Sequence, residues 1–512
     1  MHPPEASDYI PARHFTITVL GLGHIGLPTA LGFAELGWSV VGADTDTAKV
    51  ALIKQGQSPF FEPGLQELLL RHSNNKKLAF TDDVESAIRK GTVIFLCVGT
   101  PQRENGESDL TAIEALARTI SRNLSGYKLI VEKSTVPAIT GQWIRKVIER
   151  HSTNARCAWD ITGTSSFNGH GPEIFGIDLT TTSVFDVASN PEFLQEGKAV
   201  EDFFKPERIV CGVMSGIARD LMGELYQSMQ CPLVFTDVTT AELIKHAANA
   251  FLATKISFIN MLADVCEAVD ADVTKVAVGL GLDSRIGPKF LNAGLGFGGY
   301  CLPKDLRAFI HLAEEHNVKC GLLHQTELIN QERVDRLIRK VREALWIVQG
   351  KTIALLGLAF KPETDDLREA PSLHVIEKLQ KLGARLRIYD PKAMAYAQQI
   401  MPEEAGKLTY CRSAYDAAEG ADSVIVLTEW DEFRQLDLAR LRKNMHTGIM
   451  IDGRNIYDPE KLQDAGFEYL SMGRRTILPS VAPVLRPPER SSPVVMPQQP
   501  STGMPLSAAG DD

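Results

Sequence analysis

The chain has 512 residues, of which 44% are hydrophobic and 23% charged, so it is globular in composition and too long for one core. Its formal net charge of −10 argues against nucleic acid or an anionic membrane as a partner. The eight cysteines and the dispersed histidines show no metal-binding spacing, and neither a signal peptide nor a membrane-spanning run is present. We therefore expect a cytoplasmic protein without a metal site.

The first predicted strand, residues 15–20, leads directly into Gly21-Leu-Gly-His-Ile-Gly26 and a helical pattern over 27–36. A second predicted strand, 38–43, ends on Asp44. A glycine loop between strand and helix, with an acid at the next strand end, is the dinucleotide-binding fingerprint. A plain tight turn is the alternative.

Each residue of this fingerprint has a physical role. Gly21 makes the tight turn, Gly23 lets the pyrophosphate approach, and Gly26 lets helix and strand pack closely. The helix start offers free N–H groups to phosphate, and Asp44 would bond the ribose hydroxyls and repel a 2′-phosphate. The predicted cofactor is therefore NAD rather than NADP.

Two further buried strands are predicted at 93–98 and 128–132, followed by Thr100 and by Lys133-Ser-Thr135. Ligands of an open parallel sheet bind at the carboxyl ends of its strands, so these hydroxyls are placed to meet cofactor or substrate. The alternative is that each one caps a helix or stabilises a turn.

Residues 156–185 are rich in Thr, Ser and Gly without a clear period and are expected to form a long loop or irregular hairpin. Glu192 and Glu196 follow, and on a helix they would share a face. Two nearby carboxylates can raise the pKa of one and create a general base. They are otherwise solvated acids that suit a helix start.

Residues 237–269 predict one long, mostly apolar helix between domains. Lys245 and Asn249 share one face of it, and Asn is unfavourable in a helix interior, which indicates a specific polar task. Together they could donate hydrogen bonds to an oxyanion. Alternatively, the lysine reaches solvent and the asparagine caps a neighbour.

A glycine-rich stretch, residues 292–300, precedes Cys301, and Lys304 and Asp305 follow it. A cation favours the nucleophilic thiolate, so Lys304 could activate Cys301 while Asp305 orients the lysine or moves a proton. The alternative is a buried structural cysteine beside a surface ion pair.

A second alternating pattern starts at Lys351, with strands expected at 386–390, 423–428 and 448–452. It lacks a full glycine fingerprint, but Lys361 and Arg454 could face phosphate. The predicted fold class is α/β, with two Rossmann-like doubly wound domains joined by a central long-helix region. The expected parts are an extension (1–14), a dinucleotide domain (15–210) with an insertion at about 156–185, a central helical domain (211–325), a C-terminal domain (326–478) and a disordered tail (479–512).

These motifs, in this order, resemble the UDP-glucose/GDP-mannose dehydrogenase family from about Phe15 to Arg475. The resemblance rests on 21–26 with Asp44, Phe61-Glu-Pro-Gly64, 98–101, 133–135, 190–197, 245–249, 296–305, 360–362, 366–369 and 452–455. It implies an NAD domain, a helical dimerisation region, a UDP-sugar domain and a homodimer. The implied reaction oxidises the sugar C6 alcohol twice, to a carboxylate, with two NAD.

The resemblance also implies residue roles. Cys301 would form a thiohemiacetal and then a thioester, with Lys245 and Asn249 as oxyanion partners. Asp305 and a water near Thr135 would move protons, and Glu192 would act as base for hydrolysis. Implied cofactor contacts are Gly21, Gly23, His24, Ile25, Gly26, Asp44, Lys49, Thr100, Thr135, Glu196, Lys304 and Arg368. Implied substrate contacts are Glu192, Phe193, Leu194, Lys245, Asn249, Arg285 (across the dimer), Phe290, Gly298, Phe360 and Lys361.

Three functions remain open at this stage. The first is a four-electron nucleotide-sugar dehydrogenase; UDP-glucose is the expected substrate, and GDP-mannose or a UDP-N-acetylhexosamine is the alternative. The second is a two-electron dehydrogenase of the related hydroxyacid type, which needs no cysteine. The third is a non-catalytic nucleotide-binding protein. Cys301, together with Lys245 and Asn249, favours the first. The 156–185 stretch is longer than is usual for the family.

Overall fold

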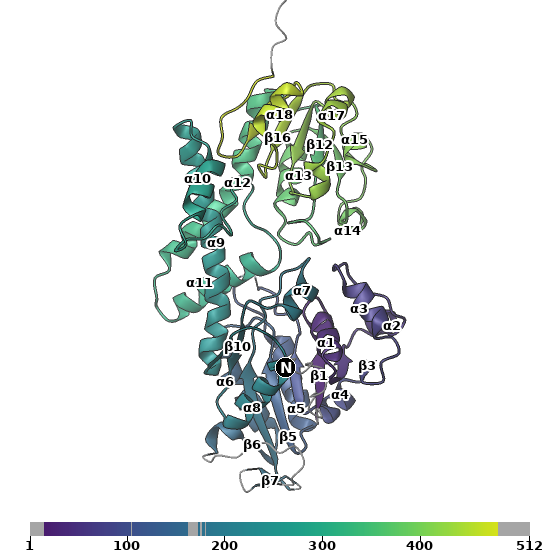
Figure 1. The fold of residues 1–512 in the computed structure, drawn as a ribbon, viewed down its shortest axis with the longest axis vertical. Helices are drawn as coiled ribbons and strands as arrows, with labels where there is room; N and C mark the ends of the chain where they lie inside the picture. Colours follow the sequence, from purple (N-terminus) through teal and green to yellow (C-terminus); the bar gives the residue numbers. More distant parts are fainter. Residues whose placement is uncertain (1–14, 104, 162–172, 175–176, 180, 480–512) are drawn as a thin grey trace, which may run out of the picture.

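The computed structural model describes residues 15–479 apart from 104, 162–172, 175–176 and 180. Two α/β lobes are stacked along the long axis and joined along one side by long helices (Figure 1). The predicted fold class is therefore confirmed. The expected extension, 1–14, and all of the expected tail beyond Pro479 lie outside the described residues.

The N-terminal lobe is built on one large sheet that is parallel except where β10 meets β9. Its strands run in the order β11 (Leu233–Thr236), β10 (Ile209–Gly212), β9 (Ser183–Ser189), β5 (Tyr127–Glu132), β4 (Val93–Leu96), β1 (Thr16–Leu20), β2 (Ser39–Ala43) and β3 (Leu78–Thr81), and β6 (Ala155–Cys157) also pairs with β9. The central strands are apolar and buried on both faces, as a parallel sheet between helix layers requires.

The sheet continues past the boundary expected at residue 210. That boundary falls inside β10, and β11 extends the sheet to Thr236 because β10 and β11 pair along their whole length. Within the expected loop 156–185, the described parts contain a short 3-10 helix (Ala158–Asp160), the hairpin β7 (Glu173–Ile174) and β8 (Ile177–Asp178), and the start of β9. The helices of this lobe are α1 (Gly26–Glu35), α2 (Thr47–Lys54), α3 (Leu65–Arg71), α4 (Val84–Lys90), α5 (Thr111–Arg122), α6 (Thr140–His151), α7 (Ala199–Phe204) and α8 (Gly216–Tyr226).

The central region contains the long helix α9 (Val238–Ala268), as predicted, and α10 (Val273–Gly281), α11 (Cys301–Glu315) and α12 (Gly321–Leu345). The Asp237 side chain caps α9 by accepting from the Thr240 N–H. Both α11 and α12 pack on α9, and α12 is continuous across the boundary expected at 325–326. No helix in the described part of the chain is long and apolar enough to cross a membrane.

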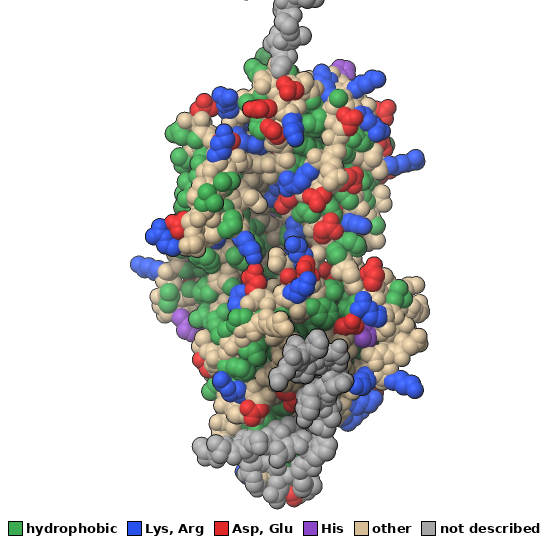
Figure 2. Space-filling view, viewed as in Figure 1, with side chains coloured by type: hydrophobic (Ala, Val, Ile, Leu, Met, Phe, Trp, Pro, Cys, Tyr) green, Lys and Arg blue, Asp and Glu red, His purple; other side chains and the backbone are tan. Residues whose placement is uncertain are grey.

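The C-terminal lobe is a second, wholly parallel sheet with its own hydrophobic core. Its strands run in the order β14 (Leu408–Tyr410), β13 (Arg385–Tyr389), β12 (Thr352–Leu356), β15 (Ser423–Val426), β16 (Ile449–Asp452) and β17 (Glu468–Ser471). Its helices are α13 (Pro371–Lys381), α14 (Met394–Ile400), α15 (Ala414–Ala417), α16 (Asp431–Arg434), α17 (Leu438–Asn444) and α18 (Pro459–Asp464). On the face shown in Figure 2, acidic and basic side chains gather where the two lobes meet.

Candidate active site

The glycine loop between β1 and α1 has the conformation that the fingerprint requires. Gly21 has φ +94°, and a Cβ there would lie 2.6 Å from the Cys97 carbonyl oxygen. A Cβ on Gly26 would lie 1.7 Å from the Gly21 oxygen. By contrast, a Cβ on Gly23 would meet no atom within 4 Å. The loop is therefore closed toward the protein and open on the side where a pyrophosphate would approach, so these residues fit a dinucleotide.

His24 and Ile25 complete this loop just before α1. The His24 ring stacks on Phe60, with 4.1 Å between ring centroids. Burial, aided by the positive charge of Arg368, lowers the pKa of His24 to about 4, so the imidazole is neutral at physiological pH. Ile25 is half-buried and precedes the first turn of the helix.

Asp44 lies directly beside the glycine loop. Its carboxylate accepts from the Leu22 N–H at 2.8 Å, from the Asp46 N–H at 2.9 Å and from Lys49 Nζ at 2.8 Å. Burial alone would raise the pKa of Asp44, but these hydrogen bonds lower it, so the group is a carboxylate. A carboxylate at the tip of β2 suits ribose hydroxyls and disfavours an added phosphate.

The hydroxyls predicted at the ends of β4 and β5 have structural partners. Thr100 Oγ1 donates to the Thr135 carbonyl at 2.8 Å, and Ser134 Oγ donates to the Val98 carbonyl at 2.6 Å. Thr100 and Ser134 therefore connect the loops at the two strand ends. In this structure they stabilise these turns, which is the alternative to a ligand-binding role. Thr135 itself is half-buried and lies on the loop that these bonds hold.

Cys301 is the first residue of α11 and has two buried charged pairs close by. Lys245 Nζ lies 3.1 Å from Glu192 Oε1, and Lys304 Nζ lies 2.6 Å from Asp305 Oδ1. Asn249 Nδ2 donates to Asp305 Oδ2 at 2.6 Å, which links α9 to α11. The structure thus brings four of the predicted catalytic residues together near the cysteine: Lys245, Glu192, Asn249 and Asp305. Their side chains are buried, so their charges act through a weakly screening interior.

Lys304 is paired with Asp305, as expected for an aspartate that orients the lysine, and the cation with the largest effect on Cys301 is Lys245. Burial raises the pKa of the Cys301 thiol to about 12, the Glu192 and Asp305 carboxylates add to this, and Lys245 acts in the opposite direction. The cation that favours the thiolate is therefore Lys245. Burial would raise the pKa of Asp305 as well, but Lys304, His246 and Lys245 lower it, so Asp305 is charged.

Glu192 and Glu196 do not share a helix face, because residues 190–195 form an irregular loop between β9 and α7. Pro191 disfavours helical backbone at Asn190, whose amide donates to the Val210 carbonyl at 2.8 Å. Glu192 faces Lys245, whereas Glu196 lies 3.1 Å from Arg368 of the C-terminal lobe. The two carboxylates consequently have separate environments. Burial, and then the nearby Asp366 charge, raise the pKa of Glu196 to about 8.

The loop that carries Glu192, Phe193 and Leu194 borders a cavity of about 110 Å³. The Phe193 ring is covered by the Arg208 guanidinium, 3.9 Å from the ring centroid, and Lys245 Nζ lies 5.2 Å from the same centroid. These three predicted substrate residues therefore lie together beside the buried lysine.

Loops of the C-terminal lobe reach the same place. Burial lowers the pKa of Lys361, while the charges of Glu196, Glu62 and Cys301 act in the opposite direction. The Arg368 guanidinium lies 4.4 Å from the centroid of the Tyr300 ring, next to the cysteine. A Cβ on Gly299 would lie 2.6 Å from the Phe360 ring, and one on Gly298 would lie 2.3 Å from the Glu369 oxygen. Phe360 and Gly298 are thus part of a tight contact between the lobes.

Residues that were not singled out as site residues hold the glycine-rich loop in place. Asn330 of α12 accepts from the Phe297 N–H at 2.8 Å and donates to its carbonyl at 2.9 Å, and Asn260 of α9 accepts from the Gly294 N–H at 2.8 Å. Arg454, which was expected to face phosphate, donates to the carbonyls of Gly296 and Leu427. An asparagine inside a helix is the signal that could have revealed Asn260 and Asn330.

Glu62, in the Phe61-Glu-Pro-Gly64 motif, holds a different loop of the site. Its carboxylate accepts from the N–H groups of Gly197 and Ala199 at 2.9 and 2.8 Å. It therefore fixes the end of the loop that begins with Glu192.

Among the described residues, no hydrogen bond or ion pair connects two of the predicted substrate residues, Arg285 and Phe290, to this site. Arg285 has a side chain that is 86% exposed, and it pairs with Asp283 at 2.7 Å. Phe290 is half-buried with φ +65° and lies ahead of the glycine-rich stretch.

Comparisons with known proteins agree with this geometry. Three family profiles match, described as the NAD binding domain (residues 15–230), the central domain (239–332) and the UDP binding domain (354–459) of one family. UDP-glucose 6-dehydrogenase TuaD of Bacillus subtilis is 42% identical over 90% of this chain and 94% of its own length. UDP-glucose 6-dehydrogenase of Rhizobium meliloti is 43% identical over 90% and 99%.

Among solved structures, a UDP-glucose dehydrogenase from Pyrobaculum islandicum superposes with a TM-score of 0.77 at 33% identity, covering 88% of this chain and 96% of that one. UDP-D-ManNAc dehydrogenase from Pyrococcus horikoshii gives 0.75 at 28% identity, covering 90% and 99%. With all three of its domains present in order, the chain belongs to the UDP-glucose/GDP-mannose dehydrogenase family.

Proposed function

We propose that this protein is an NAD-dependent UDP-glucose 6-dehydrogenase, which oxidises the C6 alcohol of the sugar through the aldehyde to UDP-glucuronate. The observation that carries the proposal is Cys301, at the start of α11, close to the Lys245–Glu192 and Asn249–Asp305 pairs. An alcohol dehydrogenase that stops at the aldehyde has no use for a cysteine there. A second oxidation needs a nucleophile, because an aldehyde has no hydride to give until a group adds to its carbonyl carbon.

Residues of the N-terminal lobe would hold the cofactor. The open side of Gly23 and the free N–H groups of α1 would receive the pyrophosphate, and Asp44 the ribose hydroxyls. His24, Ile25, Lys49, Thr100, Thr135, Glu196, Lys304 and Arg368 would line the remainder of the site. When bound, NAD supplies a hydride acceptor for each of the two oxidations.

In the first oxidation, the C6 hydroxyl loses its proton and the carbon loses a hydride, which leaves the aldehyde. Lys245 and Asn249 would donate to the C6 oxygen as negative charge develops on it. Asp305 is charged at neutral pH and hydrogen-bonded to Asn249, so it would receive the proton, directly or through a water near Thr135.

In the second oxidation, Cys301 sulfur bonds to the aldehyde carbon, and the thiol proton leaves as the oxygen gains negative charge. The tetrahedral thiohemiacetal anion then loses a hydride, and a thioester remains. Water cleaves its carbon–sulfur bond, which yields the carboxylate and returns the thiol. Glu192 is held by Lys245 and would accept the proton of that water. The overall reaction consumes one water and transfers four electrons from the sugar to two NAD.

The choice of sugar nucleotide rests on sequence similarity. The relatives at 42–43% identity are named UDP-glucose 6-dehydrogenases, whereas the UDP-D-ManNAc dehydrogenase is 28% identical. The two structural superpositions differ little, at 0.77 and 0.75. The fold therefore supports both sugars, and a UDP-N-acetylhexosamine is the second candidate.

A panel of sugar nucleotides tests the function. With NAD, UDP-glucose should give the highest kcat/KM, with two NADH per sugar and little free aldehyde, and NADP should be a poor substitute because Asp44 repels its phosphate. Cys301→Ala should lose uronic-acid formation but still bind NAD. The proposed chemistry would be refuted by near-normal acid formation in Cys301→Ala, and the substrate assignment by a higher kcat/KM with UDP-N-acetylmannosamine or GDP-mannose.

A homodimer is part of the proposal. On α9, Phe251, Phe258 and Val265 recur every seven residues and are 65%, 47% and 50% exposed. Such a stripe is typical of a helix that packs against a second copy. Arg285 has no role within its own chain beyond pairing with Asp283, and it would reach the partner's substrate. We place the protein in the cytoplasm, because a reducing environment keeps Cys301 a thiol.

A further inference from the structure

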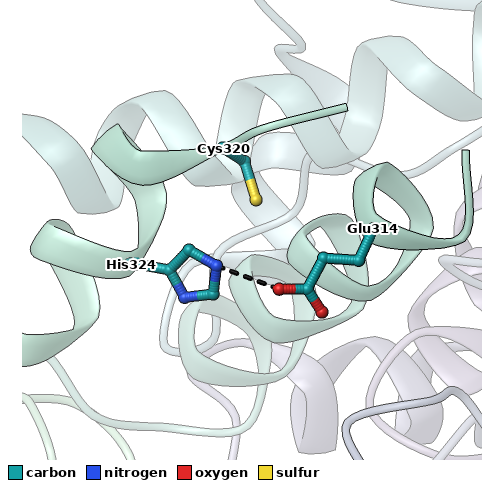
Figure 3. Close-up of side chains that lie close together, drawn as sticks. All are labelled: Glu314, Cys320 and His324. Atoms are coloured by element: carbon teal, nitrogen blue, oxygen red, sulfur yellow. Dashed lines mark hydrogen bonds and ion pairs between the residues drawn. The ribbon is translucent and has the colours of Figure 1, made fainter. Parts of the chain in front are cut away.

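Three side chains with different ligand atoms meet at the corner between α11 and α12. Glu314 belongs to the last turn of α11, Cys320 directly precedes α12, and His324 lies in the first turn of α12. Figure 3 shows all three pointing toward one another. His324 Nε2 lies 3.0 Å from Glu314 Oε1, and one ligand atom from each residue lies within 4.8 Å of the other two.

This combination of atoms has the chemistry of a zinc site. A thiolate, an imidazole and a carboxylate are ligands that zinc accepts, and four-residue spacing puts Cys320 and His324 on one face of the helix start. Bonds to tetrahedral zinc of about 2.0–2.3 Å place neighbouring ligand atoms about 3.3–3.8 Å apart. The His324–Glu314 separation of 3.0 Å lies just below that range and the other separations are at most 4.8 Å, so small side-chain rotations would reach it.

Two simpler explanations account for only part of the arrangement. A surface His–Glu pair explains the 3.0 Å contact, but such pairs contribute little, and it does not involve the cysteine. A redox-active thiol would need a stabilised thiolate, whereas burial and the Glu314 carboxylate raise the pKa of Cys320. A cation that displaces the thiol proton would use all three groups.

We propose that Glu314, Cys320 and His324 form a binding site for a divalent cation of the zinc class, with water as the fourth ligand. The side chains of Glu314 and His324 are 55% and 48% exposed, so water can reach the remaining position. The site lies at the far end of α11 from Cys301, about 20 Å along the helix axis at 1.5 Å per residue. Its role is therefore structural: the cation fastens the end of α11 to the start of α12.

Because Cys301 can also bind soft metals, the experiment starts from Cys301→Ala. After treatment with a chelator, this variant is titrated with Zn²⁺ by calorimetry and with Co²⁺ by absorbance. We expect one equivalent of each metal and a thiolate-to-cobalt charge-transfer band. Adding Cys320→Ser should abolish the band, and Glu314→Gln or His324→Ala should weaken Zn²⁺ binding at least tenfold. Zn²⁺ should raise the melting temperature of Cys301→Ala but not of the Cys320→Ser double variant.

Two residues elsewhere in the chain serve as matched controls. Cys231 is a partly exposed thiol outside this set, and His311 lies 3.5 Å from Glu315 without a cysteine. Cys231→Ser and His311→Ala should leave Zn²⁺ binding unchanged. The proposal is overturned if Cys301→Ala binds no equivalent of Zn²⁺, or if Cys320→Ser binds as tightly. In the wild-type background, Cys320→Ser should likewise lose one equivalent, which removes any dependence on how well Cys301→Ala folds.

Discussion

At the scale of single residues, Cys301 is held as a thiol before substrate arrives. Its pKa is raised to about 12 by burial and by the Glu192 and Asp305 carboxylates. A thiol of this kind resists oxidation and alkylation, and in the proposed mechanism it would become nucleophilic only as an aldehyde oxygen takes up negative charge beside Lys245.

Alkylation tests this directly. In the ligand-free protein, the rate of iodoacetamide addition to Cys301, followed by mass spectrometry, should rise about tenfold per pH unit from pH 7 to pH 10 without levelling off. The reason is that the thiolate fraction keeps growing until the pH reaches the pKa. Lys245→Met should slow the reaction further, because a buried cation that lowers the thiol pKa is removed. A plateau near pH 8 would show that the resting thiolate is already formed.

Asp186 is a buried acid whose protonation should make the free energy of unfolding depend on pH. It is fully buried in β9 and accepts from Tyr127 at 2.8 Å and from Ser215 at 2.6 Å. Burial raises its pKa to about 6 although these hydrogen bonds act in the opposite direction. The folded state therefore retains a proton that the unfolded chain loses near pH 4, and the free energy of unfolding falls as the pH rises from 4 to 6.

Asp186→Asn should remove this dependence, because an amide does not titrate. Relative to wild type, the free energy of unfolding of the variant should improve by about 3 kcal/mol between pH 4 and pH 7, measured by urea denaturation. Asp431→Asn is the control, since the Asp431 side chain is 88% exposed. An equal response from the two variants would contradict the assignment to Asp186.

At the scale of elements, the position of α11 depends on the loop before it. Residues 294–299 are bonded to Asn260 of α9, Asn330 of α12 and Arg454 of the C-terminal lobe. A Cβ on Gly296 would lie 2.2 Å from Asn330 Oδ1, so the glycine and the asparagine require each other. This pairing sets where Cys301 begins its helix.

Asn330→Leu should therefore damage catalysis beyond its effect on stability. Two buried backbone groups of Phe297 would lose their partner, at a cost of about 1–3 kcal/mol each. We expect kcat for UDP-glucose to fall at least tenfold while the affinity for NAD, measured by calorimetry, stays within about twofold of wild type. Asn330→Asp retains the acceptor and should recover part of kcat. A parallel loss of NAD binding would indicate general unfolding instead.

The features that could be predicted from the sequence are those set by residues close together in the chain. The glycine loop with Asp44, the long α9 and the second parallel sheet all follow from periodicity and turn residues. Features that depend on groups far apart in the sequence could not be predicted. Pro191 and the hydrogen bond from Asn190 to β10 keep Glu192 and Glu196 off a helix, and a cation that favours the Cys301 thiolate, Lys245, comes from a different helix. Partner choice in a buried network depends on tertiary distances that spacing along the chain does not contain.

At the scale of the whole molecule, the two lobes and the central helices form one site. Arg368 and Lys361 come from the C-terminal lobe, Glu196 from the N-terminal lobe, and Cys301 from the helices between them. The domain limits expected at 210 and 325 both fall inside regular elements, β10 and α12. A boundary drawn from composition misses such continuity, because a strand or helix can cross from one functional part to the next.

The exposed stripe on α9 predicts the assembly. Phe251→Glu combined with Val265→Glu should convert the proposed dimer to a monomer in sedimentation experiments, because charges would face the apolar side chains of the second copy. Turnover of UDP-glucose should fall in the monomeric variant, since Arg285 would no longer reach the substrate of a second copy. Arg285→Ala alone should leave the dimer intact and raise KM for UDP-glucose. A fully active monomer would show that each chain is complete by itself.

The close fit of the glycine-rich loop against the C-terminal lobe has a consequence for protein engineering. Gly294, Gly298 and Gly299 leave no room between this loop and the Gly453 oxygen, the Glu369 oxygen and the Phe360 ring. A chimera that imports a C-terminal lobe from a relative in order to accept another sugar would set foreign atoms against the loop that leads to Cys301. Residues 294–299, although they precede two helices of the central region, belong with the imported lobe, and a graft should transfer both together.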